Sequence, residues 1–566
     1  MRLLWEDKKH NFILLFILLL GLILRLWNIK QDLPYNYYGD ESYLIYLSLK
    51  FGTGDLNPHW FIWPTFFQYT LFFLFSIFYL LGKIFGWFKN TTDFLYLYLK
   101  DPSIFFLIGR ITSAFLGTAS IYLIYLLSKK IYNKKIALLS SLLFAFLPLP
   151  VEYSHYAVVD TALVFMLLLA FIFIVNIFLY NKKKDYLLSG LFIGVATATK
   201  YPAIFWVISI FLAHLFKNNK KEGFKFLFNK NIFLCIIGIF LGFFLTCPFA
   251  ILDFPKFILD IKGQILCAKI GWFGWEKTNP YLEHLFNLIS AMGFTLFLFF
   301  LLSIFYIIIK KQKDCLIFLI PTIIYFLILG LNKNTYSRFV LPILPLLVIF
   351  SSKFLYDLKI KFNKMNLLWY LMVLFLLSEP LYLSIKTDLN FSLPNTMTQA
   401  KEWVEKNIPS ESKILLNEYG PALMQSPYKI RLQAQKKPKD LLTYGYHKKR
   451  EIFYQIKEKV AKEKINYDLS YIINPIGYLE GEPNYERDIS ESIEAIKNYK
   501  EKYDLIIISD ALLYKFFHYP KELIPKKYWP IIDFYKEIMY NYKPIKEFLS
   551  LKNKTKGPNI RIYKLR

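Results

Sequence analysis

Long apolar runs constrain the fold of this chain more than any other sequence feature. Runs of about 18–20 residues, rich in Phe, Ile, Leu and Tyr, recur from Asn11 to about Lys386. A bilayer core is crossed by about 20 apolar residues in a helix. In lipid each backbone polar group must be paired within its own segment. The runs show no strand-like alternation. They therefore predict a bundle of transmembrane helices.

Composition supports this interpretation. Of the 566 residues, 55% are hydrophobic, and the mean hydropathy is +0.34. The predicted fold is a polytopic α-helical membrane protein with roughly 11–13 transmembrane helices and a C-terminal α/β domain. The predicted spans are residues 12–29, 104–128, 136–150, 160–180, 186–198, 200–216, 231–250, 285–309, 315–331, 338–355 and 366–385.

The charge pattern predicts the orientation. A net charge of +27 can indicate nucleic-acid binding, but here lysines cluster in short loops between apolar runs. Such loops are cytoplasmic by the positive-inside rule. We therefore predict no nucleic-acid partner and a multi-pass protein of the cell membrane, with the N-terminus cytoplasmic. The clusters are Lys129, Lys130, Lys134 and Lys135; Lys182 to Lys184; Lys217, Lys220, Lys221 and Lys225; and Lys310, Lys311 and Lys313.

The first apolar run, the segment of residues 65–85 and the cysteines each allow two interpretations. The first run, Phe12 to Leu26, follows basic residues but precedes no small-residue cleavage site, so we expect a retained span. Residues 65–85 are apolar enough to cross, but a single crossing there breaks the alternation, so we expect a re-entrant segment or an additional crossing. Cys247 and Cys267 could pair on the outer side. Buried free thiols are the expected state of all four cysteines.

The composition changes at about Asn390, which divides the chain into a membrane domain, residues 1–386, and an extracytoplasmic α/β domain, residues 387–566. In the second part TMTQAKEWVEKNIP predicts a helix that ends at Pro409. SKILLNE and DLIIISD predict strands, ISESIEAIKNYKEKY an amphipathic helix, and PNIRIYKLR a last strand.

Acidic residues on the predicted outer side are candidates for catalysis. Asp40 and Glu41 follow the first span, in the long first loop (residues 30–64). Asp160 opens a later apolar helix on the same side. Ionisable residues beside the bilayer are functional candidates. The structural alternative for Asp40 and Asp160 is helix N-capping.

Isolated cations on the same side are candidates for binding an anion. Lys200 and Tyr201 follow a short apolar segment, away from every cytoplasmic lysine cluster, and Arg338 precedes FVLPILP. Arg110 lies near the outer end of another span, and His155 precedes Asp160. The structural alternatives are a snorkelling lysine for Lys200 and a satisfied polar neighbour for His155.

This combination suits transfer of a group from a lipid-borne phosphate. Cations stabilise the charge that develops on a phosphate leaving group. A carboxylate can remove the proton of a hydroxyl or amine acceptor. One carboxylate base and two or three cations would therefore be sufficient.

The motifs in their order resemble the GT-C superfamily of polyprenyl-phosphate-sugar-dependent glycosyltransferases, of the protein mannosyltransferase and aminoarabinose transferase type. The resemblance spans nearly the whole chain. The matching pieces are GDESYLIYLSLKFGTG, GRITSAFLGTASIYLIYLLSKKIY, HYAVVDTALVF, GLFIGVATATKYPAIF, SRFVLPILPLL, AKEWVEKNIPSESKIL and GPNIRIYKLR.

The resemblance implies helices around a lipid-phosphate cavity, a polyprenyl-phosphate sugar as donor, an extracytoplasmic acceptor (protein, lipid or glycan) and inversion at the anomeric carbon. It maps the family's essential acid to Asp40, its second aspartate to Asp160, and a lysine near the carrier phosphate to Lys200. Phe61-Ile62-Trp63-Pro64-Thr65 departs from the family pattern, which usually supplies a charged contact there.

Three further points concern a metal ion, the transferred group and the alternative function. Asp40, Glu41 and Asp160 could converge on a divalent cation, although no ligand spacing requires a metal. The oligosaccharyltransferase WWDYG motif is absent, which disfavours transfer of a whole lipid-linked oligosaccharide. The alternative function is a transporter or flippase for a lipid-linked or anionic solute. Such proteins often show two related halves, and no internal repeat is present.

Overall fold

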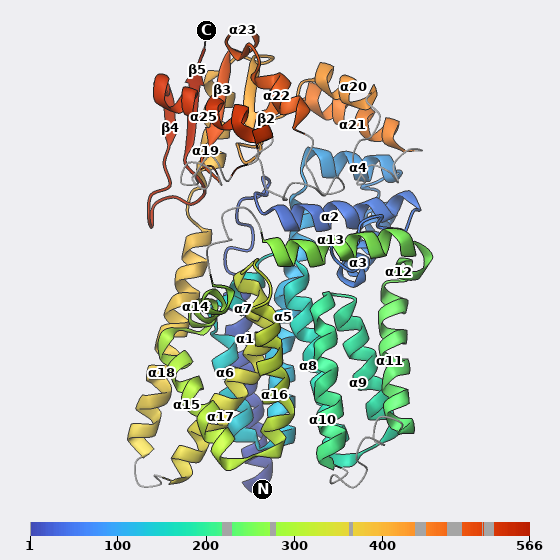
Figure 1. Ribbon diagram of the computed structural model, residues 1–566, viewed down its shortest axis with the longest axis vertical. Helices are drawn as coiled ribbons and strands as arrows, with labels where there is room; N and C mark the ends of the chain where they lie inside the picture. The colour runs from blue at the N-terminus through green and yellow to red at the C-terminus, as the bar shows by residue number, and fades with distance from the viewer. Residues whose placement is uncertain are drawn as a thin grey trace.

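The computed structural model describes residues 2–217, 229–271, 279–361, 366–435, 449–472, 489–511, 513, 524 and 526–565. A bundle of upright helices carries a sheet-containing domain at one end, and the N-terminus lies at the opposite end of the bundle (Figure 1). The end of the bundle next to the C-terminal domain is called the domain-facing end below.

The upright helices overlap the predicted spans, although several of their ends differ. They are α1 (Arg2–Leu26), α5 (Ser103–Ile131), α6 (Lys134–Ala145), α8 (Val159–Tyr180), α9 (Lys183–Thr197), α10 (Val207–Lys217), α11 (Lys230–Thr246), α15 (Phe294–Lys310), α16 (Lys313–Leu329), α17 (Leu344–Lys361) and α18 (Asn366–Phe391). Within the described residues, six helices are long and apolar enough to cross a membrane, or seven if one bent pair is a single span. One of the six is α3 (Phe66–Ile84), which is not among the upright helices. The upright helices α6, α9, α10, α11, α15 and α16 are shorter.

Close backbone contact joins α9 to α11. A Cβ atom on Gly190 would collide with the backbone carbonyl of Cys235, and one on Gly242 would collide with that of Leu191. Small residues let membrane helices approach this closely. All four cysteines are buried free thiols, as expected.

One predicted span is bent. Residues 285–309 fall on two helices, α14 (Pro280–Met292) and α15, which meet at an angle of 113°. Gly293 joins them with a φ of +84°, a left-handed conformation that glycine adopts without strain. Hydropathy alone does not reveal this break, because both helices are apolar.

The segment that broke the predicted alternation forms α3 (Phe66–Ile84). The Phe66 N–H donates to Ala198 O, just beyond the end of α9. Farther along, Phe78 contacts Phe94 and Phe105. In Figure 1, α3 lies level with α2 (Gly39–Lys50) and α13 (Phe254–Ile270) at the domain-facing end, next to α4 (Thr91–Lys100). Its contacts therefore keep it at this end along its length, although its composition would permit a crossing.

The C-terminal domain contains a five-stranded sheet in the order β2-β1-β3-β5-β4. Strands β1 (Lys413–Asn417), β2 (Asp468–Ile472) and β3 (Leu505–Ser509) are parallel, and β5 (Ile560–Lys564) is antiparallel to β3 and to β4 (Lys546–Phe548). Helix α19 (Thr396–Asn407) packs on one face, and α22 (Ser490–Ile496) and α25 (Trp529–Asn541) pack on the other. The described part of the domain also contains α20 (Pro427–Gln435), α21 (Arg450–Lys462) and α23 (Tyr499–Lys502).

Three of the five strands lie where the sequence predicts them, whereas β2 and β4 were not predicted. The helix predicted over residues 489–503 is divided into α22 and α23, because Asn498 adopts a φ of +51°. The predicted boundary at residue 386 lies inside α18, which continues to Phe391. The membrane domain therefore enters the C-terminal domain through a continuous helix.

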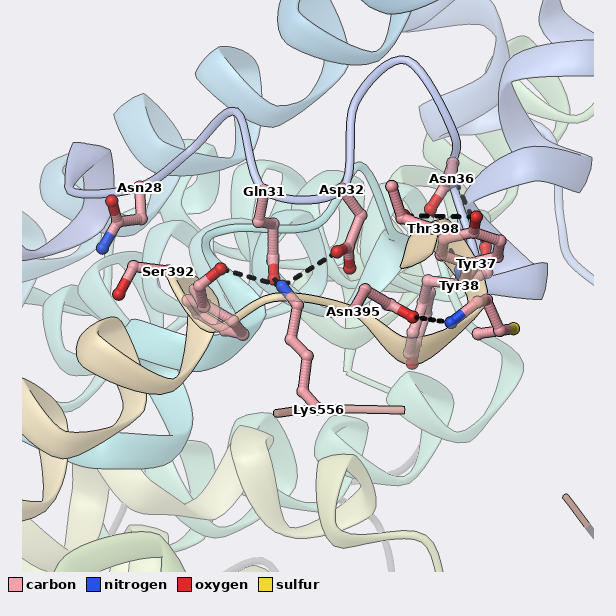
Figure 2. Close-up of polar contacts among 12 residues, drawn as sticks. Asn28, Gln31, Asp32, Asn36, Tyr37, Tyr38, Ser392, Asn395, Thr398 and Lys556 are labelled. Carbon is pink, nitrogen blue, oxygen red and sulfur yellow. Dashed lines mark hydrogen bonds and ion pairs between the residues drawn. The ribbon is translucent and has the colours of Figure 1, made fainter. Parts of the chain in front are cut away.

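Residues of the first loop contact the C-terminal domain directly (Figure 2). Lys556 Nζ lies 3.0 Å from Asp32 Oδ1 and donates to the Phe391 carbonyl at 2.8 Å. Thr398 Oγ1 lies 3.3 Å from the Tyr37 hydroxyl. Because these contacts lie a few residues before Asp40, they help to fix the loop that carries it.

Candidate functional site

Asp40 lies in the first turn of α2, and it forms an ion pair with Arg338. The Arg338 Nη1 donates to Asp40 Oδ2 and also to the Tyr38 hydroxyl at 3.0 Å. The side chain of Asp40 is 31% exposed and that of Arg338 is 13% exposed. Arg338 Nε is buried and has no hydrogen-bond partner among the described residues. This pair is therefore accessible and has an unused donor.

Asp160 forms a second ion pair, with Lys200. Lys200 Nζ donates to Asp160 Oδ1 at 2.6 Å, and the two side chains are 16% and 3% exposed. Asp160 lies in the first turn of α8, where the helix dipole favours a negative charge. Asp160 therefore fixes the position of the lysine ammonium.

The two pairs lie together. Lys200 Nζ lies 4.7 Å from the ring centroid of Phe339, which is the residue after Arg338. Burial lowers the pKa of Lys200, the charge of Asp160 opposes this effect, and Arg338 and Asp40 also act on it electrostatically. The fold thus brings two carboxylates and two cations from four distant segments to one site.

The loop before α3 is tied to this site. The Tyr201 hydroxyl donates to the Phe61 carbonyl at 2.7 Å, and the Phe61 N–H donates to Asp260 at 2.7 Å. Tyr201 follows Lys200 directly in the chain. The contact that Tyr201 makes is therefore to the first loop, at the segment where the sequence departs from the family pattern.

Glu41 and Arg110 form a third pair, which is of a different kind. Arg110 Nε and Nη2 each donate to one Glu41 oxygen at 2.9 Å. Arg110 Nη1 donates to the carbonyls of Ile29 and Gln31, and the Ala157 N–H donates to Glu41. The side chains are 0% and 1% exposed. This geometry disfavours a catalytic role for Glu41 and a substrate-binding role for Arg110, because no donor or acceptor faces solvent.

His155 is also fully buried. Its Nε2 lies 2.8 Å from Trp27 O and 3.4 Å from Asp388 Oδ1, and its Nδ1 lies 2.9 Å from Val151 O. These contacts link the end of α1, the short helix α7 (Pro148–Tyr153) and α18. The structure therefore supports the alternative in which His155 is a satisfied polar neighbour.

No metal centre is visible in the described ranges, where no three His, Cys, Asp or Glu side chains converge as ligands. Glu41 points to Arg110 rather than toward Asp40 and Asp160. The expected convergence of these three carboxylates is therefore not observed.

Sequence reasoning missed the role of Tyr38 and the raised pKa of Glu152, which precedes Asp160 in the chain. Tyr38 accepts the Arg338 hydrogen bond and stacks on Tyr156 at 4.3 Å between ring centroids. Burial raises the pKa of Glu152 to about 7. Burial also raises the pKa values of Tyr153 and Tyr156, and the charge of Glu152 adds to this effect. Tyr38 was visible only as one of several tyrosines in the first loop. Its role could not be distinguished before Arg338 was placed.

A third missed feature lies farther along the first loop. His59 Nε2 lies 2.9 Å from Asp55 Oδ2, and Asn57 Nδ2 donates to Asp253 Oδ2 at 2.8 Å. Trp60 and Trp63 follow this cluster, with ring centroids 4.9 Å apart. Asp253 comes from a loop that is distant in sequence, so spacing could not reveal the cluster.

Comparison with known proteins agrees with the motif resemblance. Residues 106–252 match the family described as Dolichyl-phosphate-mannose-protein mannosyltransferase. This segment begins in the first turn of α5 and ends with the short helix α12 (Phe249–Leu252), and it includes Arg110, Asp160 and Lys200. No curated protein matches the chain.

Two solved structures share the fold. The Archaeoglobus fulgidus oligosaccharyltransferase in its apo form has a TM-score of 0.50 and 14% identity, over 89% of this chain and 70% of its own. ArnT from Cupriavidus metallidurans, bound to undecaprenyl phosphate, has a TM-score of 0.50 and 10% identity, over 98% of both chains. The family match and the shared fold confirm the resemblance of this chain to the GT-C superfamily of membrane glycosyltransferases, of the mannosyltransferase and ArnT-like type.

Proposed function

We propose that this protein is a membrane glycosyltransferase that moves a sugar from a polyprenyl-phosphate donor to an extracytoplasmic acceptor. The observation that carries the proposal is the meeting of the Asp40–Arg338 and Asp160–Lys200 pairs at one partly exposed site. The donor class is supported by the matching family, whose description names dolichyl-phosphate-mannose, and by the ArnT structure with bound undecaprenyl phosphate.

The two cations have the chemistry to hold the donor phosphate. Arg338 has a buried Nε without a partner among the described residues, and a guanidinium can donate to two phosphate oxygens at once. Lys200 supplies a point charge that Asp160 orients. Both charges would stabilise the phosphate that leaves with the lipid.

Asp40 is the better placed of the two carboxylates to act as the base. Each carboxylate is paired with a cation, but the side chain of Asp40 is 31% exposed and that of Asp160 only 3%. The acceptor oxygen or nitrogen attacks the anomeric carbon and transfers its proton to Asp40. The bond from that carbon to the phosphate oxygen breaks, and the polyprenyl phosphate leaves. A single displacement of this kind inverts the anomeric centre.

The proposed orientation places the C-terminal domain outside the cell membrane and the N-terminus in the cytoplasm. It rests on the lysine clusters, which lie at the ends of α5, α10 and α15 and at the starts of α6, α9 and α16, at the end of the bundle away from that domain (Figure 1). The bilayer, the lipid donor and an extracytoplasmic acceptor are then the partners, and no nucleic acid is involved.

The test is transfer from radiolabelled polyprenyl-phosphate sugars in proteoliposomes, with wild type, Asp40→Asn and Asp357→Asn. Asp357 is a matched control. It forms an ion pair with Lys353, at a distance of 2.6 Å, near the C-terminal end of α17, whereas Arg338 precedes the N-terminal end of that helix. We expect label on an acceptor with wild type and Asp357→Asn, and its loss in folded Asp40→Asn. Full activity of Asp40→Asn would exclude Asp40 as the base. Label that crosses the bilayer unchanged, without transfer, would favour the flippase.

A further inference from the structure

A cavity of about 360 Å³ lies between helices α2, α3 and α4 on one side and α21 of the C-terminal domain on the other. Helix α3 contributes Phe72 and Phe75 to its walls, α4 contributes Phe94 and Tyr98, and α21 contributes Phe453. None of Asp40, Asp160, Lys200 or Arg338 lines it. The cavity is therefore separate from the proposed catalytic site.

The cavity has the size and the lining of a site for an apolar molecule. Ligand pockets in proteins measure about 300–1,000 Å³ and are lined mainly by apolar and aromatic side chains. A cavity with apolar walls gives water few partners and accepts hydrocarbon readily. Its aromatic walls therefore favour a flexible alkyl chain over a polar ligand.

The position of α3 indicates where such a chain would come from. Its last turn and the residues after it present Leu80, Leu81, Ile84, Phe85 and Trp87, which are 45–76% exposed. A contiguous apolar surface of this kind is typical of contact with lipid. The helix that forms one wall of the cavity therefore also borders the bilayer.

The rim of the cavity is polar and basic. Thr91 and Thr92 line it beside Lys449, whose ammonium donates to the Thr53 carbonyl at 2.9 Å. A lysine ammonium has three donors, so two are left after this bond. Hydroxyl groups and an ammonium at the mouth of an apolar cavity complement an anionic headgroup with an attached hydrocarbon chain.

We propose that this cavity binds an acyl chain of an anionic membrane phospholipid, with the headgroup at Lys449. Because the walls come from both domains, the lipid would join α3 and α4 to α21. It would add to the contacts already present there, in which Lys100 pairs with Glu463 at 3.1 Å and Lys464 donates to the Lys100 carbonyl.

The test uses purified full-length protein and phosphatidylglycerol that carries a photoreactive group in its acyl chain. Cross-linked peptides are identified by mass spectrometry in wild type, Ser76→Trp and Leu80→Trp. Ser76 lines the cavity, whereas Leu80 is 55% exposed on the same helix and is the matched control. We expect cross-links on α3, α4 and α21 to fall about tenfold in Ser76→Trp and to persist in Leu80→Trp.

Competition identifies the lipid. Unlabelled phosphatidylglycerol should compete more strongly than phosphatidylcholine, and Lys449→Met should remove this preference. Equal labelling of a folded Ser76→Trp would overturn the proposal, and so would competition by polyprenyl phosphate alone, which would assign the cavity to the donor tail. If Ser76→Trp does not fold, Thr92→Trp at the rim serves the same purpose. No sugar donor is present, so the result is independent of transfer activity.

Discussion

The two adjacent carboxylates of the first loop lie in opposite environments. Glu41 is completely buried, and its bidentate pair with Arg110 is completed by backbone groups. Asp40 is partly exposed, and its partner Arg338 keeps a buried donor without a partner among the described residues. A fully satisfied buried pair has no capacity left for a substrate, whereas an incompletely satisfied pair can exchange its partner for one.

An ionisable residue near a membrane is therefore not functional because of its depth alone. Intramembrane charges are functional candidates by default, and both residues meet that criterion in sequence. The number of hydrogen bonds that each already makes separates them. The comparison can be tested because the two residues belong to the same turn of α2.

The largest effect is expected for Asp40→Asn. Removal of a general base reduces the rate of transfer by about 10²–10⁴. The melting temperature should change little, because Asp40 is partly exposed and Arg338 keeps its bond to Tyr38. Transfer rate and thermal unfolding are measured on the same preparation. A large loss of stability would instead show that Asp40 is a structural residue like Glu41, and the proposed difference between the two carboxylates would be wrong.

The second effect is expected for Glu41→Gln and acts on stability. Breaking a buried ion pair leaves an uncompensated Arg110 charge and costs about 3–5 kcal/mol. The melting temperature or the yield of folded protein should therefore fall. The transfer rate per folded molecule should remain near that of wild type. A normally stable but inactive Glu41→Gln protein would return Glu41 to the catalytic group.

A third, somewhat smaller effect is expected for Lys200→Met. Loss of one cation that stabilises the leaving phosphate reduces the rate by about 10²–10³, and Lys200→Arg should recover part of it. Lys353→Met is the matched control. Lys353 forms an ion pair with Asp357, at a distance of 2.6 Å, and this pair does not belong to the candidate site. Equal losses in both lysine variants would show that the effect is on folding rather than on the phosphate.

The smallest effect concerns pH and Glu152. Burial raises its pKa from 4.5 to about 7, so the folded protein holds this proton more tightly than the unfolded chain. Its contribution to stability is therefore present below the unfolded pKa and is lost as the pH rises through about 7. Glu152→Gln should flatten the decrease in melting temperature over this range. An unchanged pH profile would contradict a buried protonated carboxyl.

Much of the architecture was predictable from sequence, for identifiable reasons. The upright helices were predicted from apolar runs, because the ability of a segment to cross lipid depends on the length and hydropathy of that segment alone. Strands β1, β3 and β5 were predicted because each is a compact apolar or alternating run. Strands β2 and β4 lie at the two edges of the sheet, where little apolar surface is buried and the sequence signal is weak.

The candidate site was predictable in its members but not in its pairing. Asp40, Asp160, Lys200 and Arg338 were singled out by residue type and by side of the membrane. That Asp40 pairs with Arg338, almost 300 positions away (|i−j| = 298), cannot be inferred from spacing. The same limit hid the contacts of Glu41, since its partner Arg110 was assigned separately to substrate binding.

The helical membrane domain, the presence of a C-terminal α/β domain and the resemblance to GT-C glycosyltransferases follow from local sequence patterns, which also predict the orientation. Which charged residues have all their hydrogen bonds made, and which can bind a substrate, depends on contacts between distant segments. The tertiary structure also places α3 at the domain-facing end of the bundle and forms the cavity that α3, α4 and α21 line. The reason is physical: hydropathy and periodicity act within a segment, whereas hydrogen-bond saturation and cavities arise where distant segments meet.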